Sequence, residues 1–66
     1  MTNLSGEKIK KIREARGLTQ MDLAVAIDCD PQFISKIERN EHKRISLDSA
    51  MKLSKYFRIS IYEIVI

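Results

Sequence analysis

Residues 19–40 read TQMDLAVAIDCDPQFISKIERN, and this stretch decides the fold. Its apolar residues recur at helical spacing on both sides of a short polar break. The pattern predicts one amphipathic helix over residues 19–27 and a second over residues 31–39. The break between them, Asp28-Cys29-Asp30, turns the chain sharply, because an aspartate tolerates the left-handed backbone conformation better than most residues other than glycine.

Both predicted helices begin with residues suited to a helix start. Thr19 is a favourable N-cap, and Asp22 follows it three residues later in near capping-box register. Asp30 caps the second helix, and Pro31 fits its first turn because a proline there loses no hydrogen bond. We therefore expect two short helices joined by a tight turn.

The second helix separates an apolar edge from a polar one. With a rotation of about 100° per residue, placing Ile34 inward turns Gln32 and Lys36 outward, with Arg39 and Asn40 near them. A solvated helix face would look the same in isolation. The preceding helix, the turn and the cap in register favour a helix-turn-helix whose second helix enters the DNA major groove, where Gln and Lys side chains read bases.

For two residues of this stretch, Phe33 and Cys29, the sequence allows two roles. Phe33 lies on the flank of the second helix, where it either packs at the rim against the first helix or contacts a thymine methyl group. Cys29 is either a small buried hydrophobic residue that fills the angle between the helices or a redox-sensing thiol; the packing role is favoured.

Arg13 and Glu38 are expected to form a partly buried ion pair. Each flanks the apolar edge of its own predicted helix. A charge near a core is costly unless it is paired. The pair would connect the first helix of the chain to the helix over residues 31–39, and its role would be structural.

Working outward, the rest of the chain also has a helical pattern. A helix is expected from Ser5 or Gly6 to Arg16, ending at Gly17. Asn40 ends the helix over residues 31–39 in the same way.

The C-terminal third predicts two more helices. Ser46 caps the first of them, and a capping box of Ser60 and Glu63 opens a last short helix over residues 61–66. The side chains expected to point inward from the helix after Ser46 are Leu47, Ala50, Leu53 and Phe57. The predicted class is therefore all-α, with five helices in a single domain over residues 1–66.

Composition limits the other possibilities. The 66 residues carry a net charge of +3, which is compatible with nucleic acid but weak evidence alone. Cys29 is the single cysteine, so an internal disulfide is excluded and a reducing cytoplasm is expected. One Cys and one distant His, His42, predict neither a metal site nor catalysis. We expect no cofactor, no small-molecule ligand and no membrane span.

The chain resembles the Cro/CI-type helix-turn-helix regulators, also called the Xre family. The resemblance covers roughly residues 6–64 and rests on the segments IKKIREARGLTQ, LAVAI, FISKIERN and SLDSAMKLSKYFRISIYEI. It implies a compact five-helix domain like that of lambda repressor, which binds double-stranded DNA as a homodimer on a palindrome. The Arg13–Glu38 pair is also a feature of that family.

The resemblance also implies roles for individual residues. Gln32 and Lys36 occupy base-reading positions of the family, and Phe33 stays a candidate for the thymine contact. Contacts to the DNA backbone are implied for Thr19, Gln20, Ser35, Arg39, Asn40, Lys43 and Arg44. Asp28 and Asn40 replace the family's usual glycines, and Ile45 replaces a frequent proline. Pro31 occupies a position that reads a base in some phage repressors, and it has no backbone N–H to donate.

The last predicted helix favours dimerisation. Residues 61–66 read IYEIVI and are apolar nearly all round, which predicts burial on more than one side. The expected two-fold interface consists of Tyr56, Ile61, Tyr62, Val65 and Ile66. It would hold two recognition helices about 34 Å apart, one turn of DNA. The alternative is a frayed apolar tail.

These observations favour a small homodimeric transcriptional regulator that controls its own synthesis and represses rather than activates. An activating contact with RNA polymerase would use Asp22, Asp28 and Asp30. The alternative function is an antitoxin or anti-repressor that acts mainly through a protein partner, but such a protein would not need the polar edge of residues 31–39.

Overall fold

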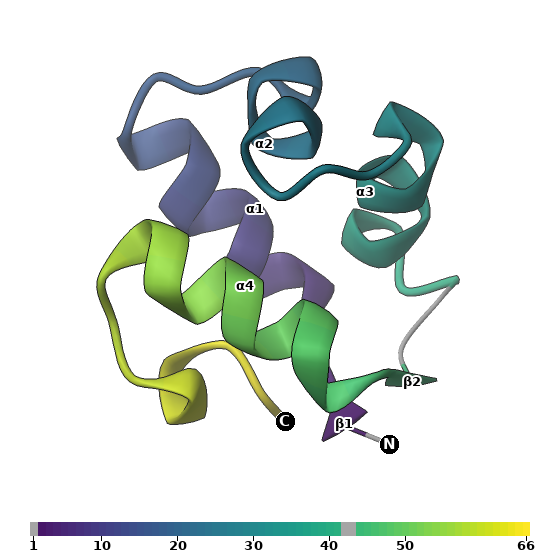
Figure 1. Cartoon of the computed structure of the whole chain (residues 1–66), viewed down its shortest axis with the longest axis vertical. Coiled ribbons are helices and arrows are strands. Elements are labelled where there is room, and N and C mark those ends of the chain that lie inside the picture. The colour runs from purple at the N-terminus through teal and green to yellow at the C-terminus, as the bar shows by residue number, and fades with distance from the viewer. Residues whose placement is uncertain (1, 42–43) are drawn as a thin grey trace.

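The computed structural model describes residues 2–41 and 44–66 and is almost entirely helical. In chain order its elements are β1 (Thr2–Asn3), α1 (Gly6–Ala15), α2 (Gln20–Ala26), α3 (Pro31–Glu38), β2 (Arg44–Ile45), α4 (Leu47–Phe57) and the 3-10 helix η1 (Ile61–Glu63). The all-α class is confirmed, and the only strands in the described part of the chain are this antiparallel pair, β1 and β2. In Figure 1, α2 and α3 lie along the top and right of α1 and α4. None of the described helices is long and apolar enough to cross a bilayer.

The α-helices begin as the sequence predicts. Their N-caps are Ser5, Thr19, Asp30 and Ser46, and each side-chain oxygen accepts a hydrogen bond from a backbone N–H of the first turn. At α2 the capping box is complete: the Asp22 N–H donates to Thr19 Oγ1 over 3.0 Å, and the Thr19 N–H donates to Asp22 Oδ2 over 2.9 Å. These bonds satisfy amide groups that a helix start leaves without partners.

The four α-helices also end alike, each with one residue at positive φ. Gly17, Asp28 and Asn40 were predicted in this role, and their φ angles are 69°, 57° and 60°. Arg58, with φ 58°, was not predicted. After α2 the Asp28 N–H donates to Val25 O and the Cys29 N–H to Ala24 O, which is the Schellman arrangement. The tight turn between α2 and α3 therefore follows directly from the way α2 ends.

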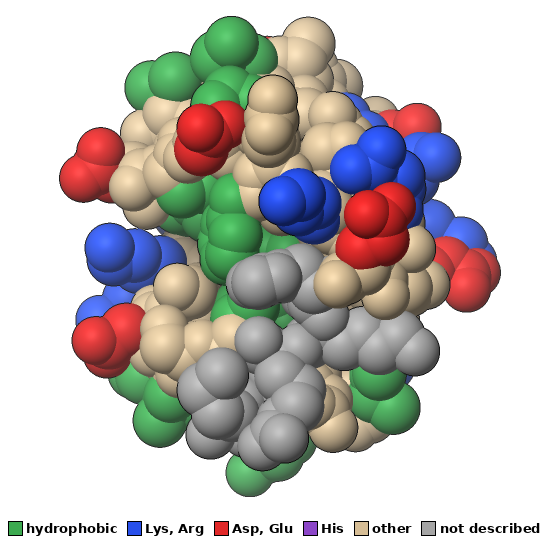
Figure 2. Space-filling model, turned by 90° about the vertical axis from the view of Figure 1, so that its right-hand side faces the viewer, with side chains coloured by type: hydrophobic (Ala, Val, Ile, Leu, Met, Phe, Trp, Pro, Cys, Tyr) green, Lys and Arg blue, Asp and Glu red, His purple; other side chains and the backbone are tan. Residues whose placement is uncertain are grey.

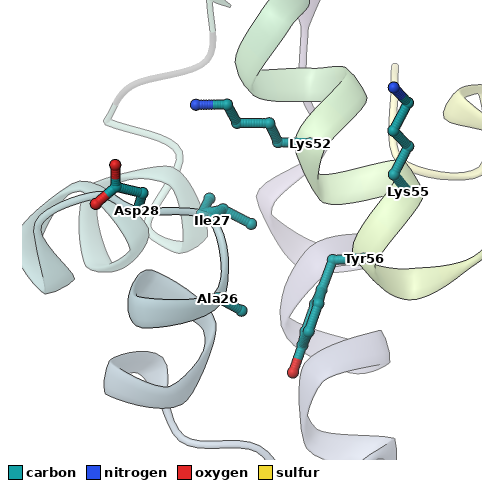
Figure 3. A pocket seen from close by; sticks show the side chains of 6 residues that line it. All are labelled: Ala26, Ile27, Asp28, Lys52, Lys55 and Tyr56. Atoms are coloured by element: carbon teal, nitrogen blue, oxygen red, sulfur yellow. The ribbon is translucent and has the colours of Figure 1, made fainter.

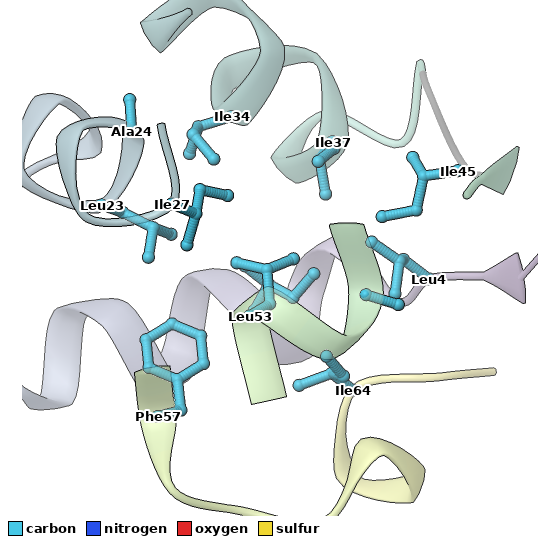
Figure 4. Close-up of a cluster of buried hydrophobic side chains, with 12 residues drawn as sticks. Leu4, Leu23, Ala24, Ile27, Ile34, Ile37, Ile45, Leu53, Phe57 and Ile64 are labelled. Carbon is cyan, nitrogen blue, oxygen red and sulfur yellow. The ribbon is translucent and has the colours of Figure 1, made fainter. Parts of the chain in front are cut away.

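One hydrophobic core joins all four helices, as Figure 4 shows. Its members are Leu4, Ile9, Leu23, Ala24, Ile27, Ile34, Ile37, Ile45, Ala50, Leu53, Phe57 and Ile64. Complete burial of one such Leu, Ile or Phe side chain stabilises the fold by about 1.5–3 kcal/mol. The prediction for Leu47 was wrong: its side chain is 54% exposed, because it lies about a quarter turn from the buried edge of α4.

The predicted fifth helix over residues 61–66 is also wrong in length and type. The Ser60–Glu63 capping box is present, but it opens only the three-residue η1. Beyond it the chain pairs with the N-terminal segment: Leu4 bridges Val65, the Ser5 N–H donates to Ile64 O, and the Ile66 N–H donates to Asn3 O. These long-range hydrogen bonds replace the helical ones, so residues 3–5 and 64–66 lie side by side (Figure 1).

The capping box of α2 predicts a pH dependence of stability. Hydrogen bonds from the Thr19 backbone N–H, and then from its hydroxyl, hold the pKa of Asp22 below its ordinary 3.8. A carboxyl group whose pKa is lower in the folded state stabilises the fold above its unfolded-state pKa, and this contribution disappears as the pH falls through the folded-state pKa. Asp22→Ala should therefore lower the melting temperature at neutral pH, and its difference from the unmodified protein should shrink in acid.

Thermal unfolding followed by circular dichroism from about pH 7 to pH 2 measures this effect. Glu14→Ala is the control, because the Glu14 carboxylate accepts no hydrogen bond from the described residues and its charge is the smallest of the causes that raise the pKa of Arg13. A difference between Asp22→Ala and the unmodified protein that persists unchanged at the lowest pH would contradict the role given to the Asp22 carboxylate.

Candidate nucleic-acid interface

The turn between α2 and α3 holds the two helices at a fixed angle. Cys29 lies in this turn and packs, half-buried, against the core. Burial, and then the negative charges of Asp30 and Asp28, raise the pKa of the Cys29 thiol. The thiol is therefore kept in its neutral form, which agrees with the packing role and disfavours a reactive thiolate.

The two edges of α3 are as different as the sequence predicts. Ile34 and Ile37 are buried, whereas Gln32 and Lys36 are exposed. Neither of these polar side chains has a hydrogen-bond or ion-pair partner among the residues described. Figure 2 views the side of the molecule on which α3 and β2 lie, and Lys and Arg side chains gather on this face with acidic ones between them. An amide and an ammonium group are thus free to meet a ligand from solvent.

Behind that edge, the predicted ion pair anchors α3 to α1. Arg13 Nε donates to Glu38 Oε2 over 2.6 Å and Nη2 donates to Oε1 over 3.0 Å, with the two side chains only 10% and 3% exposed. The remaining guanidinium nitrogen, Nη1, donates to Leu18 O over 2.6 Å. The hydrogen bonds to Glu38 are the main reason why the pKa of Arg13 rises above its ordinary value.

Gln20 joins the same network. Its Nε2 donates to Glu38 Oε1 over 3.0 Å, so the Glu38 carboxylate binds side chains from both α1 and α2. One of the two N–H groups of Gln20 Nε2 is therefore used inside the protein. A phosphate contact at Gln20 is left to the second N–H of this amide and to the backbone N–H groups at the start of α2.

The other residues predicted to meet the DNA backbone lie on several elements. Thr19 is exposed at the start of α2, and Ser35 is half-buried on α3. Arg39 is exposed and pairs with Glu41, with a distance of 2.9 Å between Arg39 Nε and Glu41 Oε2. For Arg44 the structure describes the backbone, which lies in β2. Lys43, like His42, lies outside the described residues.

Phe33 packs against the core as a partly buried side chain. This agrees with the first of its two interpretations, packing at the rim. The half-buried position leaves part of the ring accessible from solvent.

Two contacts were not foreseen from the sequence. The Gly6 N–H donates to Asn40 Oδ1 over 3.3 Å, joining the start of α1 to the end of α3. The Arg16 guanidinium donates to Phe57 O and lies 5.1 Å above the Phe57 ring, joining α1 to α4. The glycine in the first turn of α1 was the one sequence signal for the former contact, since a helix interior seldom favours glycine.

A hollow of about 410 Å³ lies between the end of α2 and α4 (Figure 3). It is lined by Ala26, Ile27, Asp28, Lys52, Lys55 and Tyr56, from the end of α2 and from α4. None of these is a residue predicted to contact DNA. Among the described residues no group of three or more His, Cys, Asp or Glu side chains is placed to hold a metal ion.

The residues predicted to form a dimer interface surround the C-terminal segment. Tyr62 and Ile66 are 80% and 77% exposed, and Tyr56 is also exposed. Ile61 and Val65 are partly buried against the core. The apolar surface therefore exists, but it is built from η1, the extended end of the chain and α4 rather than from a fifth α-helix.

The sequence of this chain is similar to those of known helix-turn-helix proteins. A family model described as Helix-turn-helix matches residues 9–64. The HTH-type transcriptional regulator PrpR of Mycobacterium tuberculosis is 32% identical over 56 residues, a match that covers 85% of this chain. The chain spans only 11% of the length of PrpR.

Two solved structures superpose closely. The restriction-modification controller protein C.AhdI from Aeromonas hydrophila has a TM-score of 0.80 at 29% identity, covering 88% of this chain and 86% of its own. SinR, the master regulator for biofilm formation, in complex with DNA has a TM-score of 0.81 at 28% identity, covering 86% of this chain and 90% of its own. SinR comes from Bacillus subtilis.

Breaking the buried Arg13–Glu38 pair should cost far more stability than breaking a pair at the surface. Glu38→Gln leaves the buried Arg13 guanidinium without its counter-charge, so we expect a loss of about 3–5 kcal/mol in the free energy of unfolding. Glu41→Gln is the matched control, because the Arg39–Glu41 pair is 58% and 55% exposed and should contribute about 0–1 kcal/mol.

Urea denaturation of both variants measures the two losses. Replacing both buried partners, Arg13→Met with Glu38→Leu, should recover much of the stability that Glu38→Gln loses, because no charge is then left buried. Equal, small losses in Glu38→Gln and Glu41→Gln would show that the buried pair does not hold α3.

Proposed function

Because this chain belongs to the helix-turn-helix family, we propose that it is a sequence-specific DNA-binding transcriptional regulator whose helix α3 enters the major groove. The observation that carries the proposal is the edge of α3 formed by Gln32 and Lys36. Both side chains are exposed and have no partner among the described residues, while the opposite edge of the same helix is buried. A helix of this kind has one face for the protein and one for a ligand.

The chemistry of that edge suits base recognition. A glutamine amide can form two hydrogen bonds with adenine, and a lysine ammonium group can donate to the O6 and N7 atoms of guanine. Phe33 lies beside them, with part of its ring accessible for a thymine methyl group. Each good base contact contributes about 1–3 kcal/mol of discrimination.

Phosphate contacts would position α3 in the groove. Around it we assign them to Thr19, Gln20, Ser35, Arg39, Asn40, Lys43 and Arg44. The exposed Arg39–Glu41 pair contributes little stability, so Arg39 can exchange Glu41 for a phosphate at small cost. Such contacts carry no sequence information but supply most of the salt dependence of binding.

We further propose that the protein acts as a homodimer on a palindromic operator and represses its own synthesis. A second copy would cover the apolar surface formed by Tyr56, Ile61, Tyr62, Val65 and Ile66. Two-fold pairing there would present two α3 helices to half-sites one DNA turn apart, about 34 Å.

Fluorescence anisotropy with Lys36→Ala tests base recognition. The duplexes are those selected by the protein from a randomised pool, with a scrambled duplex of the same length for comparison. Lys36→Ala should reduce the preference for the selected sequence by about 1–3 kcal/mol, because it removes a base contact. Lys55→Ala is the control, since it removes the same charge from the surface of α4.

Weak binding that is the same for both duplexes, and the same for both variants, would contradict the proposal. Binding of the selected duplex should also weaken as salt increases, because phosphate contacts release counterions. A separate duplex from the region upstream of the coding sequence tests self-regulation alone.

Sedimentation equilibrium tests the proposed dimer. Tyr62→Glu places a charge on a side chain that is 80% exposed in the single chain, so the fold should tolerate it. We expect the unmodified protein to be dimeric at high micromolar concentration and Tyr62→Glu to dissociate it. Val25→Glu, at an equally exposed apolar position on α2, should leave the dimer intact. A monomer at high micromolar concentration would remove the dimer from the proposal.

A further inference from the structure

The first turn of α1 touches the last turn of α3 at one unusually close point. The Gly6 N–H donates to Asn40 Oδ1 over 3.3 Å, between residues 34 apart in the chain. A Cβ atom on Gly6 would overlap the carbonyl oxygen of Ile37 and lie 3.0 Å from Asn40 Oδ1. Only glycine allows this approach, so Gly6 and Asn40 are a matched pair.

This contact decides which way the Asn40 amide faces. An asparagine side chain has one acceptor, Oδ1, and one donor group, Nδ2. With Oδ1 bound to the α1 backbone, Nδ2 is directed away from α1. Asn40 is exposed, and its Nδ2 has no partner among the described residues. The donor group is therefore fixed in direction and unused.

The backbone around Asn40 is fixed as well. Asn40 is in the left-handed region with φ 60°, and its N–H donates to Ile37 O, which closes α3. Farther along, β1 pairs with β2 so that Asn3 lies opposite Arg44. The N-terminal segment thus contacts the chain that leaves α3 at two places, once through Gly6 and once through β1.

We propose that Asn40 is a preorganised phosphate donor: α1 holds its Oδ1, and its Nδ2 donates to a backbone phosphate beside the groove that α3 enters. The inference rests on the proposed function and adds to it a second role for α1, which orients a DNA contact made by another helix. A glycine, usual at this position in Cro/CI-type regulators, would supply the left-handed backbone but neither of the two hydrogen bonds.

Two substitutions distinguish the role of the Asn40 Oδ1 atom from that of its Nδ2 group. Asn40→Asp keeps the oxygen that Gly6 binds. Its carboxylate is favourable near the first turn of α1 and unfavourable at the C-terminal end of α3, so the effects of the two helix dipoles oppose each other. The same change replaces the phosphate donor by a negative group. Asn40→Gly keeps the positive φ and removes both hydrogen bonds.

We expect Asn40→Asp to melt close to the unmodified protein, because the two dipole effects oppose each other, and to bind the selected duplex at least tenfold more weakly. Asn40→Gly should also melt close to the unmodified protein, because the freedom of glycine at positive φ offsets the lost hydrogen bond, and it should bind more weakly. In both variants the preference for the selected over the scrambled duplex should stay within about twofold of the original, because a phosphate contact carries no sequence information. If Asn40 had only a structural role, a variant that keeps its melting temperature would also keep its affinity for DNA.

Ser60→Asp is the control for net charge. It adds the same charge at the N-cap of η1, where an aspartate is an equally good cap. We expect it to weaken binding less than threefold. The proposal is overturned if Asn40→Asp binds as Ser60→Asp does, or if Asn40→Gly binds as tightly as the unmodified protein. If neither the unmodified protein nor Ser60→Asp prefers the selected duplex, the proposed function itself fails, and that result is distinct from a failure at Asn40 alone.

Discussion

The arrangement of the helices depends on one buried ion pair, Arg13 with Glu38. Its carboxylate accepts hydrogen bonds from α1 and from Gln20 of α2, and its guanidinium also donates to the Leu18 carbonyl between these helices. A buried charge without its partner is strongly unfavourable. Any shift of α3 against α1 or α2 would therefore leave a buried charge without its partner. The pair thus holds three helices in one relative position rather than simply adding stability.

Gly6 and Asn40 provide a second anchor on the same turn of α3. One anchor alone would leave α3 able to rotate about its own axis. Contacts to α1 at both Glu38 and Asn40, together with the burial of Ile34 and Ile37, remove that freedom. The outward direction of Gln32 and Lys36 thus follows from charge pairing and close packing behind them, which is what a surface that reads bases to within a hydrogen bond's length requires.

Local signals in the sequence predicted most of this architecture. Caps, helical periodicity and the left-handed positions at Gly17, Asp28 and Asn40 are properties of neighbouring residues, and the structure confirms them. The ion pair was also predictable, because each partner flanks an apolar edge. The resemblance to Cro/CI-type regulators is confirmed by the family match over residues 9–64.

The failures have a common physical origin in contacts distant along the chain. The Ser60–Glu63 capping box specifies where a helix starts, but nothing local shows that Val65 will pair with Leu4. The Gly6 contact to Asn40 is equally invisible in a helical wheel, because it requires the packing angle between α1 and α3. The role that we propose for Asn40 was therefore only half predicted from the sequence, as a DNA contact without the helix that orients it.

The same long-range pairing gives the small domain a hydrogen-bonded connection between its two proposed contact surfaces. The segment that ends at Ile66 is hydrogen-bonded to Asn3, and Asn3 lies opposite Arg44 in the strand that follows α3. A second copy bound at the C-terminal segment would thus be joined through backbone hydrogen bonds to β1, and Gly6, shortly after β1, donates to Asn40 at the end of α3. Such bonds allow little displacement, and a dimer built on them would hold its two α3 helices at one spacing. In this way the interface between copies would select the distance between half-sites, while Gln32 and Lys36 select their sequence.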